Sequence, residues 1–267
     1  MFSLRGITVP PKSKRFDVVR LILDKIGSTL SDGDILVISS KFLAISEGRV
    51  ARLDSVRTSR QAKDIAERYH VDERLCELII RESDEIIGGI PGFILTSKEG
   101  ILTPNAGIDK SNIEHGMVVL YPRRPDQLAR MIRNAIKFST GASVGVVVCD
   151  SRLSPTRRGT TGVTLAASGI EAILDMRGRK DLFGNVLKVT SQAIADDLSS
   201  AAEVLMGESD EATPIVLIRG VRQGVVRDVD YSPGKFAISA DDCVYMRSLG
   251  RGRAGADPPD RLLGAQV

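Results

Sequence analysis

The sequence predicts an α+β protein made of mixed sheets with flanking helices. Strand-like runs of Val, Ile and Leu are interspersed with segments of helical periodicity, and the two types do not alternate strictly enough for a regular doubly wound sheet. The 267 residues are 42% hydrophobic and 27% charged, which is typical of a globular protein and not of a disordered one. Because aromatic residues make up only 4% and Trp is absent, the core must be mainly aliphatic.

The first 90 residues are predicted to contain two strands and three helices. The strands are the loosely alternating run 2–9 and the apolar run 35–38. A stiff basic turn follows the first strand, and a turn rich in Asp and Gly precedes the second. Apolar residues spaced three and four apart predict helices over 16–26, 59–69 and 72–83, the last with Asp72 as its N-cap.

The middle of the chain is predicted to contain a hairpin, a helix and further strands. Gly100 lies between the strand-like runs 93–96 and 101–103, as in a tight turn. A polar loop over 105–112, a strand over 117–120 and an amphipathic helix over 126–138 follow. The Val-rich run 144–149 is the strongest strand signal, and a basic loop over 152–162 is expected after it.

The C-terminal part is predicted to hold a short strand over 187–189, a helix over 191–206, an acidic loop over 207–211 and a strand over 215–218. Beyond Arg222 the pattern weakens, so we expect a body over 1–222 and an extension over 223–267. The segment 248–267, rich in Gly, Arg, Pro and Asp, is expected to be mobile. The β-rich span 85–125 is a candidate subdomain.

Composition excludes several classes of protein. A net charge of +3 and the scarcity of aromatic residues argue against a nucleic-acid binder. Three distant cysteines without a CxxC pair indicate neither a disulfide framework nor a zinc site, and they fit a reducing, cytoplasmic compartment. No signal peptide is apparent, and no apolar run approaches the roughly 18 residues that span a membrane.

Common nucleotide and catalytic motifs are weak in this sequence. Gly250–Gly255 satisfies G-x-G-x-x-G, but it lacks the preceding strand and following helix, and there is no Walker A sequence. We therefore expect neither a Rossmann fold nor a P-loop. His70 and His115 have no partner that would suggest a zinc site or a triad. Cys149, at the end of a Val-rich strand, is predicted to be a small buried hydrophobe rather than a nucleophile.

Acidic and basic residues at loops and strand ends form the more informative pattern. Asp109, Asp150 and Glu208 are oxygen ligands of the kind that Mg²⁺ prefers beside substrate phosphates. A phosphoryl-transfer site also needs fixed cations, for which the candidates are Lys12, Lys14, Lys41, Arg157 and Arg158. Spacing alone leaves open the alternative that these are turn residues, helix caps and a solvated rim.

A series of ordered motifs carries a family resemblance. Asn105–Asp109 (NAGID) with Ser111–Asn112, Asp34–Ser40 (DILVISS) and Val144–Ser151 (VGVVVCDS) are the most specific. Further matches are Glu47–Arg49, Arg157–Gly159, Gly162–Val163, Gly178–Gly184 and Met206–Glu208. Over roughly residues 1–220 the chain resembles the ligases that add glutamate to the precursor of the deazaflavin coenzyme F420.

The resemblance implies a family-specific fold of two intertwined α+β parts and a homodimer. It implies GTP-dependent amide-bond formation, in which a carboxylate of the deazaflavin precursor becomes an acyl phosphate and reacts with L-glutamate. Further γ-linked glutamates can follow. The cofactors it implies are two divalent ions, Mn²⁺ or Mg²⁺, and K⁺.

The resemblance also assigns residues to roles. Asp109 and Asp150 would hold one metal ion, and Ser151 with Glu208 would hold the second. Nucleotide contacts are expected from Pro11, Lys12, Ser13, Lys14, Ser40, Lys41, Asn112, Met206, Gly207, Ser209, Asp210, Glu211, Ala212 and Thr213. Our own hypothesis places Arg157 and Arg158 on the anionic substrate or its phosphate.

Two pairs of residues depart from the family pattern. Ala44-Ile45 stands where relatives usually have Ser-Lys, so a phosphate-binding lysine is missing, and Lys41 or Lys12 would have to replace its charge. Leu153 and Ser154 stand where Gly-Arg is common. Two rival functions therefore remain open: a ligase of the same mechanism with another acceptor, and a non-catalytic protein that binds a nucleotide or deazaflavin.

Overall fold

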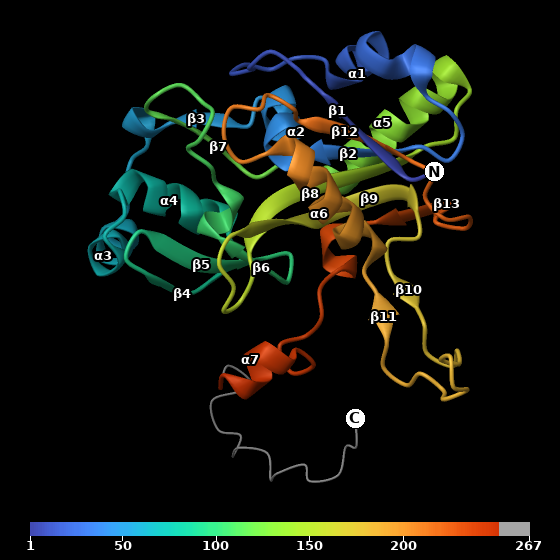
Figure 1. The fold of residues 1–267 in the computed structure, drawn as a ribbon. Helices are drawn as coiled ribbons and strands as arrows, with labels where there is room; N and C mark the ends of the chain where they lie inside the picture. The colour runs from blue at the N-terminus through green and yellow to red at the C-terminus, as the bar shows by residue number, and fades with distance from the viewer. Residues whose placement is uncertain (251–267) are drawn as a thin grey trace.

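The fold is organised around a six-stranded mixed sheet with the strand order β1-β12-β2-β8-β9-β13 (Figure 1). The computed structural model describes residues 1–250. Only β2 and β8 run parallel, while the other neighbours pair antiparallel. The strands are β1 (Ser3–Ile7), β2 (Ile35–Ser39), β8 (Gly145–Leu153), β9 (Thr160–Ile170), β12 (Ile215–Arg219) and β13 (Val226–Tyr231).

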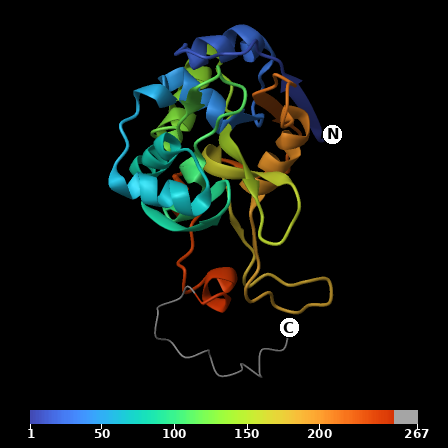
Figure 2. The ribbon, with the colours of Figure 1, turned by 90° about the vertical axis from the view of Figure 1, so that its left-hand side faces the viewer.

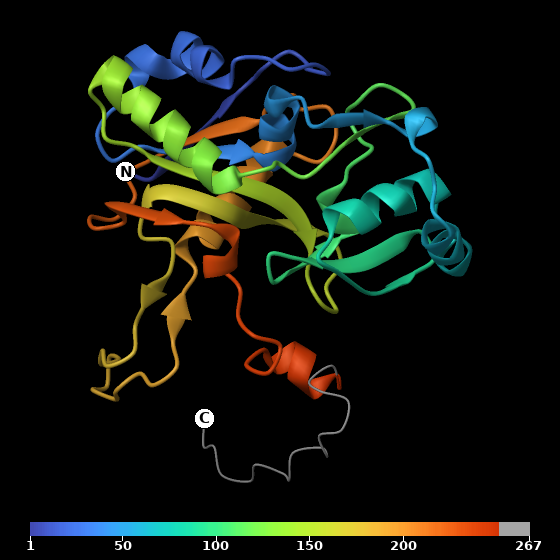
Figure 3. The same ribbon diagram turned by 180° about the vertical axis from the view of Figure 1, so that it is seen from behind.

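Helices cover both faces of this sheet. Alternation along the central strands sends Leu36 and Val146 into one apolar core and Val37 and Val147 into another, as expected for strands buried on both sides. The first core lies under α1 (Val18–Ile26), α2 (Ser40–Glu47) and α5 (Pro125–Thr140), and the second lies under α6 (Ile194–Met206). Figure 3 shows α5 and α1 on the face opposite α6.

A smaller lobe lies beside the main sheet, on the left in Figure 1. Its three-stranded antiparallel sheet β4-β5-β6 packs with helices α3 and α4 around a separate apolar core that includes Ile79 and Ile94. The two-stranded sheet β3-β7 lies between this lobe and the larger one. The elements are β3 (Val50–Arg52), α3 (Arg60–Tyr69), α4 (Glu73–Glu82), β4 (Glu85–Ile90), β5 (Phe93–Lys98), β6 (Ile101–Pro104) and β7 (Met117–Val119).

Two segments extend away from the body (Figures 1 and 2). One is an arm whose base is the short pair β10 (Leu174–Asp175) and β11 (Ser191–Gln192). The other is α7 (Val244–Ser248), which follows β13. Within residues 1–250, none of the helices is long and apolar enough to cross a membrane.

The structure confirms the α+β class and most of the predicted elements. The hairpin is β5-β6, and Gly100 has the positive φ that its turn requires (+78°). Asp17, Ser59 and Asp72 cap α1, α3 and α4 through side-chain oxygens that accept from backbone amides in the first turn. The predicted strands 2–9, 35–38, 117–120 and 215–218 and the helix 126–138 are also present, with ends shifted by a few residues.

The predicted loop 152–162 is wrong at both ends. β8 continues to Leu153, and β9 begins at Thr160, so the chain turns in a hairpin between them. The sequence obscures β9 because its residues are small. A Cβ at Gly162 would lie 2.4 Å from the Ser199 carbonyl oxygen of α6, and this close approach excludes larger side chains.

Other predictions near the C-terminus also need correction. The strand expected over 187–189 is absent from the described structure, because this stretch lies in the arm with Val189 exposed and only Leu187 hydrogen-bonds to the facing backbone, at residues 178 and 179. Ser191–Gln192 form β11, so the helix predicted from residue 191 begins only at Ile194. Beyond Arg222, β13 pairs with β9 at the edge of the main sheet. Residues 251–267, with most of the Gly250–Gly255 match and of the expected mobile tail, lie outside the described residues.

Candidate active site

A cavity of about 560 Å³ lies beyond the carboxyl end of β2. Its walls come from five stretches that are distant in the sequence, namely 9–13, 39–45, 109–114, 149–151 and 203–214. The cavity is wide enough for a small-molecule ligand, and the end of a parallel strand pair is a common place for such a site.

The staggered ends of β2 and β8 create this cavity. β2 stops at Ser39, which pairs with Cys149, whereas β8 continues for four more residues. Asp150 and Ser151 are therefore beyond the end of β2, and as strand neighbours their side chains leave opposite faces of β8. The Asp150 Oδ1 atom accepts a hydrogen bond from Ser40 Oγ (2.8 Å) on the face of α2. Ser151 Oγ instead donates to Glu208 Oε1 (2.5 Å), just beyond α6.

A pair of carboxylates lies on the Ser151 side of the cavity. Glu208 also accepts from Thr160 Oγ1 (2.5 Å). Burial works to raise the pKa of Glu208, but the hydrogen bonds from Ser151, Thr160 and Glu203 and the charge of Lys41 together lower it. Burial and the adjacent Glu208 carboxylate raise the pKa of Glu203 to about 7. Two carboxyl groups in contact in a partly buried place favour a shared proton or a bound cation.

Asp109 also lines the cavity and contacts a lysine. The Lys41 Nζ atom is 2.6 Å from Asp109 Oδ2 and also donates to Ser111 Oγ (2.7 Å). Burial alone would raise the pKa of Asp109, but the Lys41 ammonium and the Ser111 backbone amide lower it overall. Lys41 therefore links the start of α2 to the loop that follows η3 (Asn105–Gly107).

Hydrogen bonds connect the loops around the cavity. Asn112 Nδ2 donates to the Ser209 carbonyl oxygen (2.7 Å), and Ser13 Oγ donates to Glu114 Oε1 (2.8 Å). The 207–213 loop is closed internally, because the Ser209 amide donates to Glu211 Oε2 (2.9 Å). The backbone amide groups of such loops can bind phosphate oxygens in the absence of a P-loop.

The structure gathers most of the predicted site residues at this cavity and leaves a few outside it. The predicted residues that line it are Pro11, Lys12, Ser13, Lys41, Asp109, Asn112, Asp150, Ser151, Met206, Gly207, Glu208, Ser209, Asp210, Ala212 and Thr213. Ser40 and Glu211 support it through hydrogen bonds to Asp150 and Ser209, whereas Lys14 does not line it. Arg157 and Arg158 are exposed in the β8–β9 hairpin, outside the lining, and their role stays a prediction.

The departures at residues 45 and 153 differ in their surroundings. Ile45 is buried and lines the cavity, so an apolar side chain occupies the position at which relatives are expected to have a lysine. Leu153 ends β8 and is half exposed. Lys12 and Lys41 also line the cavity, and their replacement of the missing lysine's charge stays a prediction.

The donor set fits hard divalent cations. Carboxylate and hydroxyl oxygens from Asp109, Asp150, Ser151 and Glu208 are the ligands that Mg²⁺ and Mn²⁺ prefer. Within residues 1–250, no group of three or more His, Cys, Asp or Glu side chains is close enough to enclose one ion.

Sequence reasoning missed Glu203. It was treated as part of an ordinary amphipathic helix, although it lies in the last turn of α6, where the helix dipole disfavours a negative charge. That unfavourable placement was a signal for a functional carboxylate. Cys149 is buried, as predicted, and burial raises the pKa of its thiol, so the thiolate needed for nucleophilic catalysis is disfavoured.

Comparison with known proteins shows the family. The profile of the F420-0:gamma-glutamyl ligase family matches residues 6–220, which is most of the chain. The chain belongs to this family. The matched span contains all five stretches that line the cavity, and it ends just after β12.

Several curated relatives carry the name coenzyme F420:L-glutamate ligase. The protein from Methanopyrus kandleri is 39% identical over 212 residues, covering 79% of this chain and 83% of the relative. The one from Methanocaldococcus jannaschii is 42% identical over 192 residues, with 72% and 77% covered. The one from Archaeoglobus fulgidus is 37% identical over 221 residues, with 83% and 87% covered. The chain is therefore similar to these ligases over most of their length.

Proposed function

We propose that this protein is a GTP-dependent ligase that joins L-glutamate to a carboxylate of the deazaflavin coenzyme F420 precursor. The observation that carries the proposal is the cavity that Asp109, Asp150, Ser151, Glu208 and Lys41 line together. Phosphoryl transfer requires carboxylate oxygens that bind metal ions and positively charged side chains that contact the phosphates. The family membership and the names of the relatives support the same reaction.

In the proposed reaction, an oxygen of the precursor carboxylate attacks the γ-phosphorus of GTP, and GDP leaves. The glutamate amino group then attacks the acyl carbon, and inorganic phosphate leaves as the amide forms. Divalent ions, Mn²⁺ or Mg²⁺, would neutralise charge on the phosphates. Asp109 and Asp150 would hold one ion, and Ser151 with Glu208 would hold the other. Use of K⁺, addition of further γ-linked glutamates and a homodimer belong to the same proposal.

The loops of the cavity would bind and orient the nucleotide. The hydrogen bond from Asn112 to Ser209 holds two of these loops at a fixed separation. Lys12 and Lys41 would contact phosphate oxygens. Such positioning accounts for much of the catalysis in phosphoryl transfer.

The decisive experiment is incubation of the protein with GTP, Mn²⁺, L-glutamate and the unglutamylated precursor, followed by mass spectrometry and a phosphate assay. We expect a mass increment of one or more glutamates together with phosphate release. Phosphate release only with a different acceptor would replace the proposal with a ligase of another substrate. Nucleotide or deazaflavin binding without any turnover would replace it with a binding protein.

A further inference from the structure

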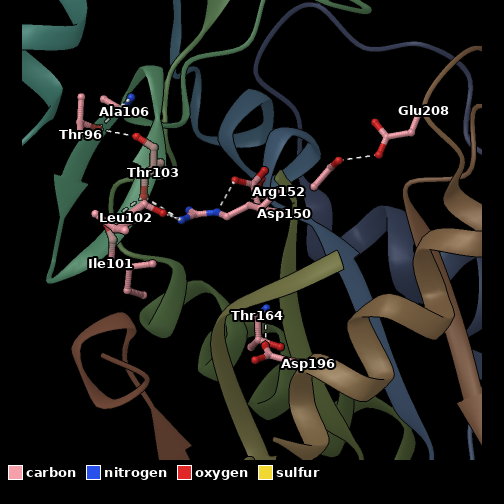
Figure 4. A network of polar contacts seen from close by, with 12 residues as sticks. Thr96, Ile101, Leu102, Thr103, Ala106, Asp150, Arg152, Thr164, Asp196 and Glu208 are labelled. Atoms are coloured by element: carbon pink, nitrogen blue, oxygen red, sulfur yellow. Dashed lines mark hydrogen bonds and ion pairs between the residues drawn. The ribbon is translucent and has the colours of Figure 1, made fainter. Parts of the chain in front are cut away.

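Arg152 is a buried arginine that joins β8 to the smaller lobe (Figure 4). Its side chain is 5% exposed and lies on the same face of β8 as Asp150, two residues earlier. The Nε atom is 3.3 Å from Asp150 Oδ2. At its other end, Nη1 donates to the Leu102 carbonyl oxygen (2.9 Å) and to Thr103 Oγ1 (2.7 Å), both on β6.

The hydrogen bonds continue from β6 to the turn before Asp109. Thr96 Oγ1 donates to the Thr103 carbonyl oxygen (2.6 Å) and accepts from the Ala106 amide (3.2 Å). Ala106 has a positive φ of +53° in the turn that leads to Asp109. A continuous series of polar contacts therefore connects Asp150 on the main sheet with the loop that carries Asp109.

Stability alone does not explain a buried arginine at this place. Among the described residues, its Nη2 atom is buried without a hydrogen-bond partner, which costs free energy. An apolar side chain of similar volume is often at least as stable as a buried ion pair. The guanidinium does fix the orientation of the Asp150 carboxylate, because Ser40 contacts one of its oxygens and Arg152 contacts the other. Contacts of this kind orient carboxylates that ligate metal ions.

We infer that Arg152 is a positioning residue that holds the Asp150 carboxylate in place and aligns it with the Asp109 loop. The inference rests on the proposed function, in which Asp109 and Asp150 hold one divalent ion. It makes a prediction opposite to that of simple electrostatics. A positive charge beside Asp150 should repel a cation, so removing that charge should tighten cation binding. Loss of orientation should weaken it instead.

Calorimetric titration of the full chain with Mn²⁺ tests this inference. We expect Arg152→Met to weaken Mn²⁺ binding about 10-fold or more, although it removes a positive charge. Arg152→Lys keeps the repelling charge but cannot bridge Asp150 and β6, so it should weaken binding at least as much as Arg152→Met. Thr103→Val leaves Asp150 untouched but removes one acceptor of the bridge, and it should weaken binding several-fold.

A matched control and a double mutant separate orientation from general damage. Arg133→Met removes an arginine that pairs with Asp228 outside the cavity (2.8 Å), and it should leave Mn²⁺ affinity unchanged. Adding Thr103→Val to Arg152→Met should have no further effect on affinity, because the bridge is already lost. Thermal unfolding of each variant checks that it is folded.

The outcomes are distinguishable. Mn²⁺ binding by Arg152→Met that equals or exceeds that of the wild type overturns the inference and leaves the metal site intact. If Arg152→Met does not fold, unchanged affinity in Thr103→Val overturns it instead. If the wild-type protein binds no Mn²⁺, the proposed metal site fails and the inference fails with it.

Discussion

Asn112 donates a hydrogen bond from its side-chain nitrogen to the carbonyl oxygen of Ser209, 2.7 Å away, across loops that are 97 residues apart in the sequence. Both residues line the cavity. The contact sets the separation of the two walls between which we propose that GTP binds.

We expect Asn112→Ala to raise the KM for GTP about 3- to 10-fold with a smaller change in kcat. A net contribution of about 1 kcal/mol from the lost hydrogen bond gives this magnitude, and it acts on nucleotide binding. Initial rates measured against GTP concentration provide the test. A loss confined to kcat would mean that the contact acts on the chemical step instead.

Asp150→Asn should abolish turnover, with at least a 100-fold loss of phosphate release, while the protein stays folded. The amide keeps the shape of the side chain but loses the charge that a divalent cation requires. The control is Asp228→Asn, because Asp228 is an exposed aspartate paired with Arg133 outside the cavity. Full activity of Asp150→Asn would exclude its role as a metal ligand.

Gly207→Ala should lower the free energy of unfolding by about 2 to 3 kcal/mol and weaken GTP binding. At φ +68° and ψ 178°, Gly207 is in a region that is essentially restricted to glycine. A Cβ there would also meet the Glu211 carboxylate, which holds the Ser209 amide. Gly141→Ala is the control, because at φ +78° it has open space and should cost only about 1 kcal/mol. If urea unfolding gave the two variants equal losses in the free energy of unfolding, the steric argument would be contradicted.

Stability at high pH should depend on Tyr231 in β13. Burial and the hydrogen bond that its hydroxyl donates to Glu171 raise the pKa of Tyr231 to about 12. The unfolded phenol ionises near pH 10, so above that pH the folded state binds more protons and stability falls until about pH 12. Tyr231→Phe removes this titration, so the decline between pH 10 and 11 should be shallower in urea unfolding. An identical decline in both proteins would disprove the assignment.

Local sequence patterns were sufficient to predict those helices and strands whose own residues determine their structure. The apolar spacing and the capping side chain of Asp72 predicted α4, and the Gly100 turn predicted the β5-β6 hairpin. The edge strand β13 was missed because its residues are half polar and form a strand only where β9 provides a partner.

Some residues of the candidate site could likewise be predicted from the sequence, whereas one contact could be recognised only in the structure. Residue types and ordered motifs alone selected Asp109, Asp150, Ser151 and Glu208 as oxygen ligands, and the structure places all four on one cavity wall or another. The place of Glu203 near the end of a helix is visible in the sequence, but its contact with Glu208 depends on how α6 packs. Proximity between carboxyl groups depends on packing, which no short sequence window contains.

The sequence by itself determined the α+β class, most helices and strands, and the chemical character of the site, because these follow from periodicity, turn residues and side-chain type. Only the tertiary structure decided that β8 extends beyond β2, which opens the cavity and sends Asp150 and Ser151 to opposite faces. It alone also revealed that Arg152 bridges Asp150 and β6. The physical reason is that strand register and long-range hydrogen bonds depend on residues about 50 to 110 positions apart, which come together only in the folded chain.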